Sequence, residues 1–247
     1  MQPLSDKPLV VRVYGDSISM PRCSEGVMVE DSWPSLLEDF LREAGWKCPR
    51  VLNRSLGGAT VREIKAIFDR DMVYFKSQPG VVVFRFGIVD CTPRPIPLWM
   101  RDVIGKNPLN LGRPIISFLH RHRAAMIKRK FFQNTDADSF SKMYRQMVQA
   151  AVADGNSCVC MGIGPVSSMM EERSTGLLRE MARYNKLIEA HAAECHCLYA
   201  PSETVFPMGD DSVLLNDGHH NSKNGNLLAA RYVAQAITAR CNLGICP

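Results

Sequence analysis

The sequence predicts an α/β fold, a three-layer sandwich in which helices cover both faces of a flavodoxin-like, five-stranded parallel sheet. Five short apolar segments alternate along the chain with longer segments whose apolar residues recur at helical spacing. Strands that alternate with helices in this way form parallel sheets, because each helix returns the chain to the same edge of the sheet.

The expected strands are short, and the third of them is the most strand-like stretch of the chain, β-branched and bounded by Pro79 and Gly80. In chain order the strands are LVVRVY (9–14), RVLNRS (50–55), GVVVFRFG (80–87), SCVCMGIG (157–164) and CHCLYA (195–200).

The expected helices are amphipathic, and two of them have capping residues, Thr60 at a start and Gly155 at an end. In chain order they are SWPSLLEDFLREAGW (32–46), TVREIKAIFDRDM (60–72), SFSKMYRQMVQAAVADG (139–155), EERSTGLLREMARYNKLIEAHAAEC (171–195) and NGNLLAARYVAQAITAR (224–240).

The whole chain, residues 1–247, is expected to form one domain with a basic insertion at about 91–135. A connection of this length is unusual and indicates a lid, a cap or a partner surface. Its basic helical stretch, PIISFLHRHRAAMIKRKFF (114–132), could be a solvated helix face, a peripheral membrane helix, a cap over the site or a dimer contact. Its length and aromatic content favour the cap or the interface.

Composition narrows the class of protein. The chain is 46% hydrophobic and 22% charged, which is typical of a globular domain. It has neither a run of 18 uncharged apolar residues nor a recognisable signal peptide, so we expect a cytoplasmic protein. The net charge of +5 permits an anionic substrate, and no nucleic-acid-binding motif is present, so no nucleic-acid partner is expected.

Nine cysteines are present, and without an export signal we expect mainly small core residues or free thiols. Cys241 and Cys246 could pair if oxidised. A zinc site at His191, Cys195, His196 and Cys197 is disfavoured, because CxC is a poor structural-zinc spacing and no second pair accompanies it. We therefore expect no metal site in this segment.

Residues that could support nucleophilic catalysis follow the expected strands. Ser17 follows the first strand, and Asp217 and His220 lie three residues apart near the C-terminus. A serine nucleophile needs an imidazole base, and a carboxylate usually orients that base. Ser17 could instead be only a helix N-cap, but Pro21 makes the segment after it a poor helix. Gly58 and the N–H of Ser17 could bind a developing oxyanion.

These motifs resemble those of the SGNH, or GDSL-type, esterase and lipase family. The matching residues are GDS after the first strand, the glycine of NRSLGGAT, a G-x-x-D stretch after the third strand and D-x-x-H near the C-terminus. The resemblance implies that Ser17 is the nucleophile, His220 the general base and Asp217 its orienting partner. It also implies that the N–H groups of Ser17 and Gly58 are oxyanion donors, and that neither metal nor cofactor is used.

One position departs from the family pattern. The third block of the family usually reads G-x-N-D, whereas this chain has Gly87-Ile88-Val89-Asp90. Valine cannot donate the hydrogen bond that the asparagine supplies. Asn53, Arg85, Thr92 and Arg94 are candidates to replace it, Asp90 is expected to be a strut within its loop, and His219 could contact substrate.

The function expected from these residues is hydrolysis of ester-linked acyl groups on a small molecule or carbohydrate by a Ser-His-Asp triad. Two alternatives remain open: an O-acyltransferase that uses the same triad, and a non-catalytic binding protein on a degenerate hydrolase fold. A phosphoester substrate is a weaker possibility, suggested by the positive charge.

Overall fold

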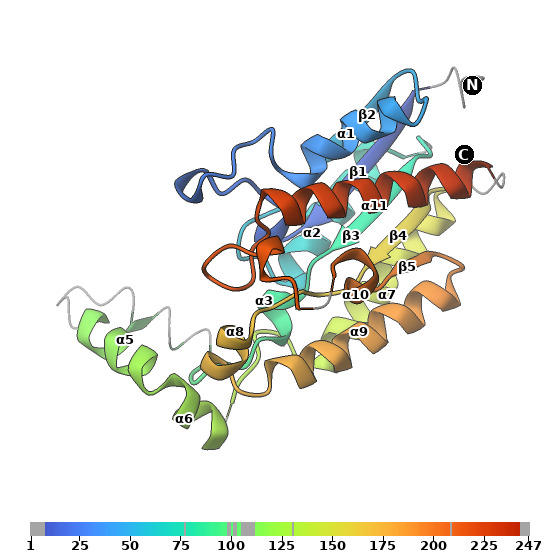
Figure 1. Cartoon of the computed structure of the whole chain (residues 1–247). Coiled ribbons are helices and arrows are strands. Elements are labelled where there is room, and N and C mark those ends of the chain that lie inside the picture. Colours follow the sequence, from blue (N-terminus) through green and yellow to red (C-terminus); the bar gives the residue numbers. More distant parts are fainter. Residues whose placement is uncertain are drawn as a thin grey trace.

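A computed structural model describes residues 8–76, 78–97, 100, 103–104, 112–129, 131–207 and 209–242. A parallel sheet of five strands lies between helices on both of its faces (Figure 1). The predicted α/β fold is therefore confirmed. The strands are β1 (Leu9–Gly15), β2 (Pro49–Asn53), β3 (Val81–Arg85), β4 (Ser157–Met161) and β5 (Leu198–Ala200).

The order of the strands across the sheet, β2-β1-β3-β4-β5, is that of flavodoxin-like folds. Gly15 of β1 lies opposite Arg85 of β3, so the loops that follow these two strands begin side by side. The direction of strand addition reverses between β1 and β3, and open parallel sheets bind their ligands at such a point. The fold thus brings the loop that contains Ser17 to this edge.

An aromatic core covers one face of the sheet. Val82 and Phe84 of β3 belong to this core, and the rings of Tyr14 and Tyr144 lie 5.9 and 5.7 Å from that of Phe84. Tilted ring contacts of this kind add to the free energy of burial. The helices over this face are α2 (Val61–Tyr74), α7 (Ala137–Ala153) and α9 (Leu177–Glu194).

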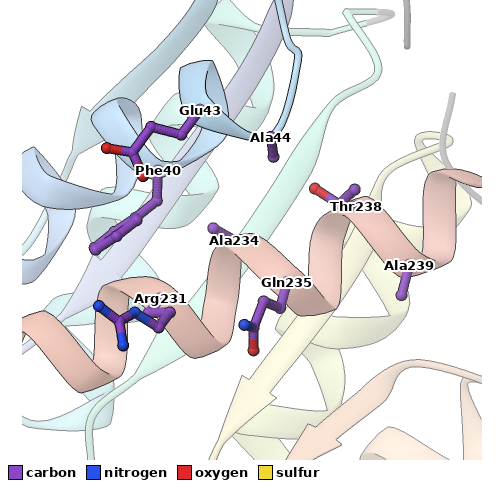
Figure 2. A pocket seen from close by; sticks show the side chains of 8 residues that line it. All are labelled: Phe40, Glu43, Ala44, Arg231, Ala234, Gln235, Thr238 and Ala239. Atoms are coloured by element: carbon purple, nitrogen blue, oxygen red, sulfur yellow. The ribbon is translucent and has the colours of Figure 1, made fainter. Parts of the chain in front are cut away.

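The opposite face is covered by α1 (Trp33–Glu43) and α11 (Lys223–Asn242), which pack against each other (Figure 1). A surface pocket of about 520 Å³ opens between these helices, with Phe40 and Arg231 among its lining residues (Figure 2). The lining residues all belong to the two helices or to Ala44, which follows α1. None follows the carboxyl end of a strand, so this pocket is separate from the predicted site.

The insertion begins after α3 (Ile88–Cys91) and contains α5 (Gly112–Arg121) and α6 (Arg123–Arg129), which project from the sheet layers (Figure 1). The helical stretch predicted over 114–132 is therefore two helices that meet at His122. Residues 98–99, 101–102, 105–111 and 130 of the insertion lie outside the described part. Whether the segment contacts a membrane or a second copy stays a prediction.

The two ends of the insertion are joined directly. Arg94 and Phe132 exchange both backbone hydrogen bonds, with N···O distances of 2.8 and 2.9 Å. Between these ends, α6 packs against α8 (Ser168–Arg173), which follows β4. The insertion is thus attached to the main body at its base and through α6.

The single helix predicted over 171–195 is wrong, because the chain breaks between α8 and α9. Gly176 precedes α9 with φ +89°, a left-handed conformation that favours glycine. The Glu171 carboxylate accepts the N–H groups of Gly176 and Leu178 at 2.7 and 2.8 Å, which satisfies two donors at the start of α9.

No helix among the described residues is long and apolar enough to cross a bilayer. Seven of the described cysteines are free thiols, whereas Cys241 is disulfide-bonded. Cys246 lies outside the described residues.

Candidate active site

A buried carboxylate fixes the turn that contains Ser17. The chain leaves β1 in a 3₁₀ turn, Ser17–Ser19, and the side chain that caps it is Asp16. The Asp16 carboxylate accepts the N–H of Ile18 at 3.0 Å and that of Gly87 at 3.3 Å. Burial raises the pKa of Asp16 to about 6 despite these bonds. Asp16 therefore ties the turn to the loop after β3, and the hydroxyl of Ser17 is left for another partner.

That partner is His220. The Nε2 atom of His220 lies 2.8 Å from Ser17 Oγ, and its Nδ1 atom lies 2.5 Å from Asp217 Oδ2. The other carboxylate oxygen of Asp217 accepts the backbone N–H groups of His219 and His220 at 3.1 and 3.0 Å. The structure thus brings together the three residues that the sequence singled out, although 203 positions separate Ser17 from His220.

A tight turn makes the contact between Asp217 and His220 possible. Gly218 has φ +79°, and its N–H donates to the carbonyl of Leu215 at 2.9 Å. The N–H of Leu215 in turn donates to the carbonyl of His220 at 2.8 Å, which closes the loop. A side chain at residue 218 would also clash, because its Cβ would lie 2.1 Å from Ser167 Oγ.

The charge on Asp217 decides which nitrogen of His220 carries a proton. Burial raises the pKa of Asp217, but hydrogen bonds from His220 and His219 outweigh burial and lower it to about 2. Asp217 is therefore a carboxylate at neutral pH and can only accept hydrogen bonds. Nδ1 of His220 must donate to it, which leaves Nε2 of the neutral ring as an acceptor for the Ser17 hydroxyl.

The two backbone donors predicted for the oxyanion have no acceptor among the described residues. The N–H groups of Ser17 and Gly58 make no hydrogen bond to any described residue. Gly58 has φ +70° in an exposed turn after β2, a conformation that L residues rarely adopt. Both donors can therefore serve a ligand, as an oxyanion hole requires.

A small pocket of about 180 Å³ lies beside Ser17. Three of the residues predicted as substrate or oxyanion contacts line it, Thr92, Arg94 and His219, and so does Val89. Burial and the neighbouring His220 lower the pKa of His219, which favours its neutral form. The residues that line the pocket are Ser17, Ile88, Val89, Thr92, Arg94, Arg123, Met170 and His219.

Two other candidate contacts do not line this pocket. Asn53 holds neighbouring backbone: its amide donates to the carbonyl of Ser19 at 2.8 Å and accepts the N–H of Ser55 at 3.1 Å. Both carboxylate oxygens of Asp90 lie 3.1 Å from the N–H of Val61 at the start of α2. Burial raises the pKa of Asp90 to about 7. Asp90 is thus a strut, and it joins α3 to α2.

Arg85 points to the face of the sheet covered by α1 and α11 and does not line the pocket either. Its guanidinium lies 5.6 Å from the ring of Trp33 and 5.3 Å from that of Phe206, and it donates to Asn221 Oδ1 at 3.2 Å. Burial lowers the pKa of Arg85 to about 10. Because Asn221 follows His220 in the chain, the hydrogen bond from Arg85 helps to hold the loop that contains His220.

The sequence-based list of site residues lacks Arg22, Arg123 and Met170. Arg22 lies 3.6 Å from the Asp217 carboxylate, and Arg123 and Met170 line the pocket. The three residues lie in separate segments of the chain, and no sequence motif links these segments. Their closeness to the site therefore becomes visible only when the segments are packed together. The basic character of the insertion was the one sequence signal that pointed to Arg123.

One group of described side chains has donors close enough to hold a metal ion: Asp217, His219 and His220, whose ligand atoms lie within 4.8 Å of one another. Both ring nitrogens of His220 already have partners in the chain, Asp217 and Ser17. A metal ion on His220 would replace one of these contacts.

Comparisons with known proteins agree with this architecture. The model of the GDSL-like lipase/acylhydrolase family matches residues 13–228, a range that contains Ser17, Asp217 and His220. No curated protein matches the sequence.

Three solved structures illustrate the shared fold. A lipase/acylhydrolase from Enterococcus faecalis is 17% identical with a TM-score of 0.65, over 94% of this chain and 96% of that one. A catalytic mutant of an acetylxylan esterase from Geobacillus stearothermophilus is 18% identical with a TM-score of 0.64, over 96% of each chain. The psychrotrophic esterase EstA from Pseudoalteromonas is 14% identical with a TM-score of 0.59, over 94% of this chain and 98% of that one.

Proposed function

Since this chain belongs to the GDSL-like lipase/acylhydrolase family, we propose that it hydrolyses short acyl esters of a small molecule or carbohydrate, with Ser17 as nucleophile. The observation that supports this role most directly is the pair of contacts made by His220, 2.8 Å to Ser17 Oγ and 2.5 Å to Asp217 Oδ2. A serine hydroxyl becomes a nucleophile when an oriented imidazole removes its proton.

The reaction proceeds in two acyl-transfer steps. Ser17 Oγ attacks the ester carbonyl while His220 Nε2 takes the hydroxyl proton, and Asp217 stabilises the imidazolium that results. The N–H groups of Ser17 and Gly58 receive the oxyanion. His220 then gives its proton to the leaving alcohol, and it activates the water that releases the acyl group.

The size of the pocket favours a short acyl group. Its volume is about 180 Å³. A space of this size suits an acetyl group better than a long fatty acyl chain. One of the structurally similar proteins acts on acetylxylan, which is consistent with this choice.

The test is hydrolysis of 4-nitrophenyl acetate by the wild type, Ser17→Ala and a matched control, Ser24→Ala. Ser24 is exposed and does not line the pocket. We expect Ser17→Ala to lose at least 10³-fold in kcat, because the nucleophile is gone, and Ser24→Ala to keep its activity. Circular dichroism spectra must show that both variants are folded.

Val89 supports a second candidate, a binding protein without catalysis, because its side chain leaves the oxyanion hole one donor short. An organophosphonate probe separates the two functions. Covalent labelling of wild-type Ser17, absent in Ser17→Ala, supports the hydrolase. Equal ester turnover in the wild type and Ser17→Ala, or a Ser17 that never reacts, would exclude it.

A further inference from the structure

Two arginines line the pocket beside Ser17. Arg94 comes from the loop after α3, and Arg123 is the first residue of α6. None of the described lining residues is Asp or Glu. Because the pocket is small, about 180 Å³, a ligand that fills it contacts walls contributed both by Ser17 and by these two arginines.

Arg123 lies in an unusual environment for a charged side chain. It is half-buried, and its Nη2 atom donates to the carbonyl of Pro93 at 3.2 Å. Its Nε atom is buried without a hydrogen-bond partner among the described residues. Burial, together with the positive charge of Arg173 on α8, lowers the pKa of Arg123. Within the described part of the chain, no carboxylate pairs with this guanidinium.

A purely structural role does not account for this arrangement. A guanidinium has five N–H donors, and the bond to Pro93 uses one of them. The buried Nε–H group has no acceptor among the described residues, and a buried donor without a partner is costly. Here the charged neighbour is another cation, so the arrangement is explained if an anion occupies the pocket when the protein acts.

We propose that Arg94 and Arg123 form a subsite for an anionic group, a carboxylate or a phosphate, carried by the ester substrate. Arginine suits both groups, since its planar fork of donors matches two oxygens of either one. The proposal rests on the proposed hydrolase function of Ser17, and it narrows that function to acyl esters of acids or phosphates. The net charge of +5 favours the approach of such substrates.

Three small acetyl esters test the subsite. Acetoxyacetate has a carboxylate beside the ester, 2-acetoxyethyl phosphate has a phosphate, and acetoxyacetamide is the neutral match. Acetate release gives kcat/KM for each ester. We expect at least one of the anionic esters to exceed the amide by roughly tenfold or more, the usual effect of a charge-assisted hydrogen bond. The ratio between the two anionic esters identifies the preferred group.

Arg123→Gln is the variant that tests the residue, and Arg129→Gln is its matched control. Arg129 lies on the same helix, is exposed and does not line the pocket, so this variant removes the same charge elsewhere. We expect Arg123→Gln to lower kcat/KM on the preferred anionic ester roughly tenfold more than on acetoxyacetamide. Arg129→Gln should change neither value. If Arg123 has only a structural role, Arg123→Gln should lower kcat/KM by the same factor on the anionic ester and on acetoxyacetamide.

Binding measured without turnover keeps this proposal separate from the hydrolase proposal. Glycolate, inorganic phosphate and glycolamide are titrated into the wild type and both variants, and the arginine Nε–H resonances are followed by NMR. Arg123-dependent binding of an anion with no ester hydrolysis would reject the hydrolase and support the subsite. Equal binding of the anions and glycolamide, or equal kcat/KM for all three esters, would overturn the subsite and leave the hydrolase intact.

Discussion

The side-chain amide of Asn134 donates a hydrogen bond to the backbone carbonyl of Val89 at 3.0 Å. Val89 occupies the position at which the family resemblance predicts an asparagine, and it lines the pocket beside Ser17. The chain therefore has an asparagine next to this position, and uses it to hold the backbone of Val89. Because the Val89 backbone is held by another residue, its side chain can be exchanged to test what the position contributes.

Replacing Val89 by asparagine should increase the rate of ester hydrolysis. The amide of Val89→Asn would add a donor at the site of the developing oxyanion, and one such donor is worth on the order of 10²–10³ in rate when it is well placed. We expect kcat on 4-nitrophenyl acetate to rise by roughly tenfold, since the surrounding loop has not adapted to the amide.

Val89→Leu is the control, because leucine changes the size of the side chain without adding a donor. A similar increase in both variants would show that steric relief causes the effect. A decrease in Val89→Asn at unchanged stability would show that the chain places its oxyanion away from residue 89.

Removing the charge of Asp217 should lower kcat with little effect on KM. In Asp217→Asn the amide no longer dictates that Nδ1 of His220 donates, so Nε2 can lose its role as acceptor for Ser17. We expect a loss of roughly 10²–10⁴ in kcat. Steady-state kinetics test this, with Asp39→Asn, an exposed carboxylate on α1, as control. Activity within about threefold of the wild type would remove Asp217 from the proposed triad.

The stability of the protein should decrease between pH 4 and pH 7 in a way that depends on Asp90. Its pKa rises from 3.8 to about 7 on folding because of burial, so in this range the folded protein keeps a proton that the unfolded chain has lost. Rising pH therefore favours unfolding, with a maximum slope of about 1.4 kcal/mol per pH unit for one proton.

Urea denaturation at several pH values measures this effect in the wild type and in Asp90→Asn. Asparagine can still accept the N–H of Val61 but does not titrate, so the variant should show a flatter dependence on pH. Asp16, whose pKa burial raises to about 6, also lowers the stability as pH rises. Because Asp16 is present in both proteins, its effect cancels in the comparison. Identical pH profiles would show that Asp90 is ionised in the folded protein.

The aromatic core should be far more sensitive to truncation than the insertion. The Phe140 side chain is fully buried and lies 4.9 Å from the ring of Tyr184, whereas Phe118 on α5 is 59% exposed. Phe140→Ala should lower the free energy of unfolding by about 3–5 kcal/mol, because it removes apolar contact and leaves a cavity. Phe118→Ala should change it by less than about 0.5 kcal/mol. Equal losses in both variants would contradict the assignment of the core.

The sequence predicts the sheet and the triad contacts for the same physical reason. The strands are short apolar segments whose carboxyl ends lie at one edge of the sheet, so the loops with Ser17 and His220 are expected at that same edge. Side-chain direction was also available from the sequence for Arg85. Side chains alternate between the two faces of a strand, so Arg85 lies on the face opposite Phe84, with Val81 and Val83. This is the face covered by α1, where Arg85 contacts Trp33 and does not reach the pocket.

Other features depend on contacts that no local pattern reports. Arg123 reaches the pocket because α6 packs against α8, and 28 residues separate it from Arg94 in the chain. The predicted helix ran through residues 171–176 (EERSTG), although this segment has no apolar side chain and ends in glycine. The conformation of Gly176 and the bonds made by Glu171 decide the break before α9.

The pair of hydrogen bonds between Arg94 and Phe132 also bears on how such proteins diversify. Since the ends of the insertion already meet, the segment between them can be shortened, lengthened or exchanged without moving β3 or α7. Ser17, Asp217 and His220 belong to the frame, whereas Arg123 belongs to the exchangeable segment. On the functions proposed above, the reaction would depend on residues of the main body, and the preference for an anionic ester would depend in part on a residue of the insertion.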